Sequence, residues 1–280
     1  MMKFNHYTVG ALPTLTWESE LPCTFYELLE EYHTQLEPLR DGISDILLLN
    51  DVKNLELILK ERVEANEGLK GNLEKGKIEF YRARFVEIEE LEEFMEEPFI
   101  NRPHDNYPEF MMDYFLEYRS DEERFKHIEE LYIGYFRYLQ TRENGFIRYY
   151  GRIATTIRTV LVAMRIIKSG LDLEKNLKGD PFIVQTILEN RSNADFGLKN
   201  ILPEVPEIIA LFDKERDPVE VERDLDRIRF KLMEDVGKES PFADHIIYSY
   251  LIGFMLRNRW NSLDSSKGET ILDNIVEGNY

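Results

Sequence analysis

The side chains of this chain that could carry out chemistry are few and widely spaced. Glu30 and His33 form one Glu-x-x-His motif. A di-iron carboxylate bundle needs two such motifs and two further glutamates, and a glutamate-rich sequence supplies one copy by chance. The histidines show no ligand spacing along the chain: they are His6, His33, His104, His127 and His245. The sequence therefore predicts no metal site.

The triplet Asp195-Phe196-Gly197 has the spelling of the magnesium-binding triplet of protein kinases. A kinase also needs a His-Arg-Asp catalytic loop and a glycine-rich phosphate loop, and the sequence has neither. It also lacks a Cys-x-x-Cys pair and the Gly-x-Ser-x-Gly of a nucleophile elbow. Because no catalytic or cofactor-binding motif is found, a binding or mechanical role without a cofactor fits the sequence better than an enzyme.

A block of glutamates between Glu87 and Glu97 is the most acidic stretch of the chain. Apolar residues at helical spacing, among them Phe85, Ile88 and Leu91, run through the same stretch. Charge blocks on amphipathic helices are normally solvated faces, and no histidine is interleaved here. We interpret the block as a solvated face rather than a metal site.

Charge and composition exclude several classes of function. The chain has 280 residues, 43% of them hydrophobic, and a formal net charge of −19, which disfavours binding to nucleic acid or to anionic lipid. Cys23 is the single cysteine, so no internal disulfide forms and a cytoplasmic protein is expected. The longest apolar run, His245 to Leu256, is shorter than the ~20 residues of a membrane helix. No signal peptide and no membrane span are predicted.

Nearly every long segment has apolar residues at three- and four-residue spacing, and almost none alternates with period two. This pattern predicts an all-α fold, with any strands confined to the N-terminus. Thr24 and Glu27 form a predicted capping box, and Gly170 a predicted helix stop. Three prolines within residues 98–108 break regular structure, so we expect three helical lobes over residues 1–98, 109–180 and 181–280.

The stretch from Ser240 to Leu263 is predicted to be one long helix. Ser240 is a suitable N-cap, and Pro241 suits the first helical position. Phe242, Ile246, Tyr250 and Phe254 repeat every fourth residue, so this helix is expected to be buried on most sides. The basic end, Arg257 to Trp260, complements the helix dipole or contacts a partner.

Three apolar stretches with a late positive residue resemble one another. They are residues 47–60, 150–165 and 246–259, about a hundred residues apart. Such a degenerate match is weak evidence for a threefold repeat by itself, because buried helices have similar sequences.

These stretches resemble helices of the family of central-stalk rotor proteins of V-type and archaeal-type ATPases. Asp51 to Asn54 with Leu59-Lys60 matches that family's Asp-x-x-Asn and late Leu-Lys in the first lobe. Tyr250-Leu251 and Arg257-Asn258 match the last lobe. The middle lobe departs, because Ala154 or Thr155 replaces the aspartate. The segment from Tyr7 to Leu15 is also similar to the start of uncharacterised bacterial proteins encoded among V-type ATPase subunits.

The resemblance implies three related helical lobes in a funnel. It implies a non-catalytic rotor part that links the central-shaft subunits to the membrane rotor ring and transmits torque during ion and proton transport. Such a protein lies on the cytoplasmic face of the membrane and has no cofactor and no membrane span of its own.

Six residues are the candidates for contact with partners: Asn54, Lys60, Arg158, Arg165, Arg257 and Arg259. Arginine is common at interfaces because its planar fork pairs with carboxylates. The alternative for each arginine is an intramolecular salt bridge or exposure to solvent. Two other functions stay open: a helical scaffold or regulatory binding protein of another complex, and a helical enzyme with a metal held by carboxylates.

Overall fold

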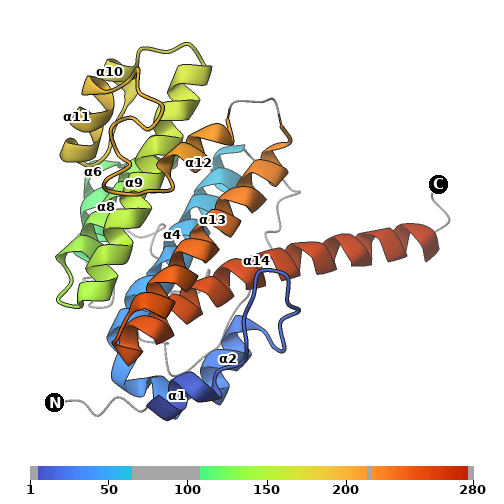
Figure 1. Cartoon of the computed structure of the whole chain (residues 1–280). Helices are drawn as coiled ribbons and strands as arrows, with labels where there is room; N and C mark the ends of the chain where they lie inside the picture. Colours follow the sequence, from blue (N-terminus) through green and yellow to red (C-terminus); the bar gives the residue numbers. More distant parts are fainter. Residues whose placement is uncertain (1–5, 65–107, 213–215, 277–280) are drawn as a thin grey trace. The chain divides into compact units, whose positions relative to one another are not determined.

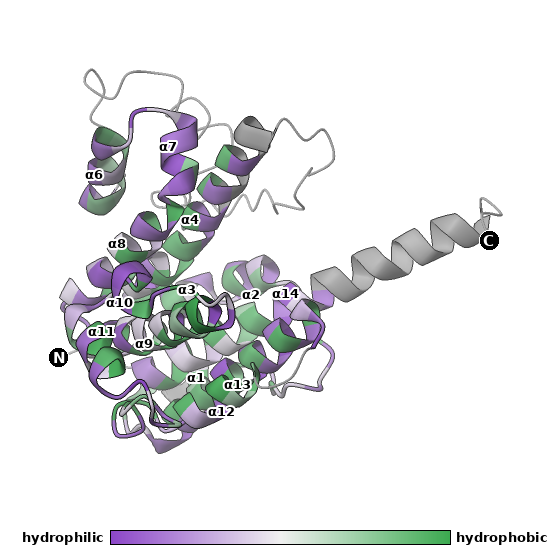
Figure 2. Ribbon diagram, turned by 90° about the horizontal axis from the view of Figure 1, so that it is seen from above, coloured by the Kyte–Doolittle hydropathy of each residue, from purple (hydrophilic) through white to green (hydrophobic). Residues whose placement is uncertain are grey.

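The computed structural model describes residues 6–64, 108–212 and 216–276 (Figure 1). All regular structure in these ranges is helical, so the predicted all-α fold is confirmed. The helices carry polar and apolar residues along their length (Figure 2), as amphipathic helices do. The glutamate block at 87–97 and the proline-rich stretch up to Tyr107 lie outside the described residues.

The chain divides into two compact units, and the first is discontinuous in sequence. The first unit contains residues 1–39 and 210–280, and the second contains residues 40–209. The lobe boundary expected at residues 180 and 181 lies within the second unit. Three related lobes in a funnel stay a prediction.

The first unit is built around a pair of long helices, α13 (Pro218–Glu239) and α14 (Ala243–Val276). The short helices α1 (His6–Ala11) and α2 (Phe25–Glu31) pack on α14. The turns α3 (His33–Leu36) and η1 (Glu37–Leu39) follow. Since α1 is helical, the described part of the N-terminal segment contains no strand.

Two local predictions in the first unit have different outcomes. The capping box is confirmed, because Thr24 N donates to Glu27 Oε2 at 2.7 Å and Glu27 N donates to Thr24 Oγ1 at 3.3 Å. The predicted start of the last helix is wrong, since α14 begins at Ala243. Ser240 is the C-cap of α13, so residues 240–242 are needed to reverse the chain. Phe242 is consequently 59% exposed and lies outside the buried stripe.

The second unit contains a long helix, an antiparallel pair and several short helices. The long helix is α4 (Arg40–Glu64), and the pair is α8 (Ile128–Thr141) with α9 (Gly145–Lys168). The short helices are α6 (Glu109–Glu117), α7 (Asp121–Lys126), α10 (Leu173–Asn176) and α11 (Pro181–Glu189). α12 (Val205–Ala210) follows at the boundary between the units.

The start and end of α9 follow from local chemistry. Asn144 caps its N-terminus by accepting hydrogen bonds from Phe146 N at 2.9 Å and Ile147 N at 3.1 Å. At its C-terminus Gly170 has φ +67°, a left-handed conformation that glycine adopts without a steric cost. The predicted stop at Gly170 is therefore confirmed.

Tyrosines form a large part of the core of the second unit. Tyr135 is fully buried, and its hydroxyl donates to the carbonyl oxygens of Asp45 at 3.1 Å and Ile46 at 3.3 Å. Burial raises its pKa well above the ordinary value. Tyr138 donates to Asp45 Oδ1 at 2.9 Å, and Arg142 Nε donates to Oδ2 of the same carboxylate at 2.8 Å. The tyrosine-rich stripe is thus structural.

Candidate protein-binding site

Helix α9 is basic in an acidic chain. It contains no aspartate or glutamate, and its cations are Arg148, Arg152, Arg158, Arg165 and Lys168. At 100° per residue, its four arginines fall within an arc of roughly 140°. Buried Ile153, Ile157, Val160 and Met164 occupy the opposite side. The sequence of α9 therefore turns its apolar side inward and its arginines outward.

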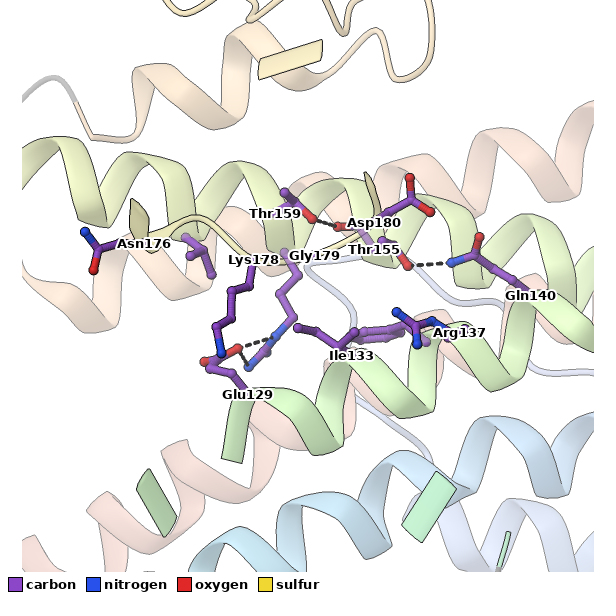
Figure 3. A pocket seen from close by; sticks show the side chains of 13 residues that line it. Glu129, Ile133, Arg137, Gln140, Thr155, Thr159, Asn176, Lys178, Gly179 and Asp180 are labelled. Atoms are coloured by element: carbon purple, nitrogen blue, oxygen red, sulfur yellow. Dashed lines mark hydrogen bonds and ion pairs between the residues drawn. The ribbon is translucent and has the colours of Figure 1, made fainter. Parts of the chain in front are cut away.

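A cavity of about 130 Å³ lies beside this arginine side. Side chains of α8, α9 and the segment 176–180 converge on it (Figure 3). All of them belong to the second unit. An apolar cavity of about 150 Å³ accommodates benzene, so the α8–α9 cavity has room for a group of the size of one side chain.

The segment before α11 is held against α9 by a glycine and a cap. Gly179 has φ +153°, and a Cβ atom added there would lie 2.8 Å from Thr159 Oγ1, so only glycine fits this position. Asp180 then accepts hydrogen bonds from Phe182 N at 3.0 Å and Ile183 N at 3.2 Å, which start α11. These two residues form one wall of the cavity.

Most charges at the cavity are paired within the unit. Arg158 donates to Glu129 Oε2 through Nε at 3.0 Å and through a terminal nitrogen at 2.5 Å, and it stacks on the Tyr132 ring at 4.0 Å. Lys178 Nζ donates to Glu130 at 2.7 Å, which raises the pKa of Lys178. These ion pairs fix the rim of the cavity.

Arg137 of α8 is different. It lines the cavity and is exposed, and its side chain forms no hydrogen bond or ion pair within the described part of the chain. The same holds for the exposed side chains of Arg152 and Arg165 on α9. We call Arg137, Arg152, Arg158 and Arg165 the basic face. It offers open guanidinium groups to an anion.

The other residues of the cavity favour binding over reaction. Ile133, Phe136 and Val162 supply apolar wall, and Gln140 Nε2 donates to Thr155 Oγ1 at 2.8 Å. The hydroxyls of Thr155 and Thr159 donate to backbone carbonyls at 2.8 Å, so no base activates them. The residues that line the cavity include no histidine or cysteine. Across the described ranges, no group of three His, Cys, Asp or Glu residues is arranged to hold a metal ion.

Two of the predicted contact residues are held inside the first unit. Arg257 is only 8% exposed, donates to Ser19 O at 2.9 Å and lies over the Trp17 ring. Arg259 donates to Asp226 Oδ2 at 2.9 Å and to Glu222 at 3.1 Å. The basic end of α14 thus has an intramolecular role, and a role in partner binding is not tested.

The other predicted residues lie in the second unit. The structure brings Arg158 and Arg165 to one side of α9, two turns apart. Asn54 and Lys60 are on α4; the side chain of Asn54 lies outside the described residues, and Lys60 is half-buried. Sequence reasoning missed Arg137, because no motif marks a lone arginine on an aromatic-rich helix.

Comparison with known proteins identifies the family. The model of the family described as "Protein of unknown function (DUF2764)" matches residues 2–278. The chain belongs to this family. Two curated proteins are similar to this DUF2764 chain, and both carry the name "Uncharacterized protein". No solved structure matches the chain.

Both relatives come from Chlamydia. The protein of Chlamydia muridarum (strain MoPn / Nigg) is 20% identical over 175 residues. The protein of Chlamydia trachomatis serovar D (strain ATCC VR-885 / DSM 19411 / UW-3/Cx) is 22% identical over 177 residues. In each case the match covers 61% of this chain and spans 65% of the relative's own length.

The family match corrects the resemblance drawn from the sequence. Assignment to the central-stalk family of V-type ATPases, or to proteins encoded among V-type ATPase subunits, is wrong, because the model that covers nearly the whole chain belongs to DUF2764. Describing the chain as a V-type ATPase or ATP synthase component in ion and proton transport loses its support with it. The expected rotor function and its partners are not tested by these comparisons. The described helices include none that is long and apolar enough to cross a bilayer.

Proposed function

We propose that this DUF2764 chain is a non-catalytic α-helical scaffold or regulatory protein that binds a protein partner through the basic face of its second unit. The observation that carries the proposal is the charge of α9: it has cations and no acid in a chain of net charge −19. Arg152 and Arg165 stay unpaired there within the described ranges.

The unpaired arginines support binding because acidic residues are abundant in this chain. With 54 acidic residues against 35 basic ones, most exposed cations have an acid within reach, as Lys178 and Arg158 do. Arginine is enriched at protein interfaces because its planar group pairs bidentately with carboxylates and stacks on aromatic rings. An open row of arginines is suited to an acidic partner surface.

A protein partner is favoured over other polyanions. Nucleic acid and anionic membranes present a uniform negative field, and a chain of net charge −19 is repelled by it. A folded partner can place acidic groups opposite the basic face alone. A cytoplasmic location stays a prediction from the cysteine content.

The test is co-purification of the full-length chain from its native cells. The double variant Arg152→Glu and Arg165→Glu should lose a stoichiometric partner that the unmodified chain retains, because repulsion replaces two ion pairs. The matched control is Lys199→Glu with Lys231→Glu, which changes the net charge equally at exposed lysines outside α9.

Two results would count against the proposal. One is equal recovery of the partner by both double variants, which would place the interface elsewhere. The other is a metal ion or turnover product that accompanies the purified chain in stoichiometric amount, which would favour the enzyme alternative.

A further inference from the structure

We infer that the α8–α9 cavity receives one acidic side chain of the partner, flanked by apolar residues, and that Arg137 is its counter-ion. This inference rests on the proposed function and names the chemistry of the partner: a segment with carboxylates spaced along it. Nothing in the family description or in the relatives assigns a ligand to this cavity.

The charges at the cavity point to a carboxylate. Glu129 is paired with Arg158, and Lys178 is paired with Glu130. Asp180 is occupied as the cap of α11. The guanidinium of Arg137 therefore stays available, and a carboxylate is the group that an arginine fork binds best.

The walls and the volume point to a side chain with an apolar part. Ile133, Phe136 and Val162 line the cavity together with Arg137, so a ligand that leaves water there buries methylene or methyl groups as well as charge. A space of about 130 Å³ fits a side chain of the size of glutamate, and larger cofactors do not fit.

The spacing of the open arginines favours a polypeptide over a free small acid. Arg152 and Arg165 are thirteen residues apart on α9, which is about 20 Å along a helix axis. A small acid bound to Arg137 reaches neither of them, whereas about six residues of extended chain span that distance. A segment with three acids can engage all three arginines at once.

Disulfide capture tests the inference without a known partner. Val162→Cys places a thiol in the cavity wall, and Cys23→Ser removes the single native cysteine. This variant is equilibrated, under a reducing buffer, with 3-mercaptopropionic acid or with the equally sized 3-mercaptopropanamide, and intact mass measures the captured fraction. We expect roughly five- to tenfold preference for the acid, as one partly desolvated ion pair supplies.

Substitutions identify the group that recognises the acid. Adding Arg137→Gln should remove the preference, because the amide side chain keeps the size but loses the charge. Adding Lys199→Gln, an exposed lysine of the same unit, should leave it unchanged. Equal capture of acid and amide by the starting variant, or an acid preference that survives Arg137→Gln, overturns the inference. Circular dichroism checks that each variant is folded.

A second arm separates the source of the carboxylate. A cysteine-containing peptide with three glutamates should be captured more efficiently than its triglutamine counterpart by a larger factor than the small acid shows over its amide. Arg152→Gln with Arg165→Gln should reduce that factor to the small-acid value. A peptide with no such advantage means a site for a free organic acid and overturns the partner segment. If the charge-reversed chain keeps its partner in co-purification while acid-selective capture persists here, the proposed function fails and the cavity assignment does not.

Discussion

Asp226 is the residue on which the most polar contacts of the first unit converge. Its side chain is fully buried. It accepts hydrogen bonds from Arg229 at 2.7 Å, from Arg259 at 2.9 Å and from Trp260 Nε1 at 3.0 Å. Trp260 packs in a cluster with Trp17 and Phe230. A buried carboxylate with three donors is satisfied, and removing it leaves the donors without an acceptor.

Asp226→Ala should lower the free energy of unfolding of the first unit by about 3 kcal/mol. This is the low end for a broken buried ion pair, because Arg229 and Arg259 are partly exposed and can be rehydrated. The chain has two tryptophans, Trp17 and Trp260. Tryptophan fluorescence during urea unfolding therefore reports on this cluster.

Asp226→Asn is the matched control for that experiment. The amide oxygen still accepts from Trp260 Nε1, so the loss should be clearly smaller than for alanine. A change below about 1 kcal/mol for Asp226→Ala would mean that the three contacts are dispensable, at the level of an exposed ion pair.

Tyr135 makes the stability of the second unit sensitive to alkaline pH. Burial raises its pKa in the folded chain, whereas an unfolded tyrosine ionises near pH 10, a pKa of about 10. Its contribution to stability is therefore complete below about pH 10 and is lost as the pH rises above that value.

Tyr135→Phe tests this linkage. The variant should be less stable at neutral pH, because the hydrogen bonds to Asp45 O and Ile46 O are lost. Above about pH 10 the difference from the unmodified chain should narrow by about 1.4 kcal/mol per pH unit. Unfolding in urea, followed by circular dichroism at several pH values, measures it. A difference that stays constant with pH would contradict the expectation.

At the scale of elements, the pairing of α8 with α9 depends on a close approach at Gly151. A Cβ atom at this position would lie 2.8 Å from Leu139 Cβ, which is shorter than packing tolerates. Overpacking a core typically costs about 1–3 kcal/mol, and the helix propensity gained by replacing glycine with alanine returns about 1 kcal/mol. The close contact outweighs the propensity.

Gly151→Ala should therefore destabilise the α8–α9 pair by up to about 2 kcal/mol and speed hydrogen exchange in residues 128–168. Gly145→Ala is the control in the same helix, because a Cβ atom there meets only Arg148 at 3.9 Å. It should be neutral or stabilising. Equal protection in both variants would show that α8 can shift away from Gly151.

At the scale of the whole molecule, charge is distributed unevenly. The net charge of −19 keeps the chain soluble and repels polyanions at long range, but fields beyond about 8 Å are screened at physiological salt. The cations of α9 thus act at contact distance. Binding of an acidic segment there is compatible with an acidic protein for this reason.

The division into two compact units leads to a prediction about cooperativity. Asp226→Ala should raise hydrogen exchange in α13 and α14 and leave α8 and α9 protected, whereas Gly151→Ala should do the reverse. Each change alters contacts inside one unit, and contacts within a unit set its local stability. Mass spectrometry of exchanged peptides measures both variants. Increased exchange throughout the chain from either change would mean that the units unfold together.

Local signals in the sequence were sufficient for much of the fold. The helical period predicted the all-α class, the Thr24 and Glu27 pair predicted a capping box, and Gly170 predicted the end of α9. Each depends on neighbours within about one helical turn, which a sequence displays directly. The start of α14 was missed because Ser240 also ends α13, and two helices compete for the same turn.

The sequence by itself determined the helices, the acidic net charge and the basic composition of α9. The tertiary structure alone decided which arginines are open: Arg257 is buried, Arg259 is bonded to Asp226, and Arg137 lines a cavity with α9. The physical reason is that pairing of a charge depends on groups distant in sequence, Asp226 for Arg259 and Glu129 for Arg158. The helical period specifies which side of a helix a residue occupies, and only packing specifies what lies opposite.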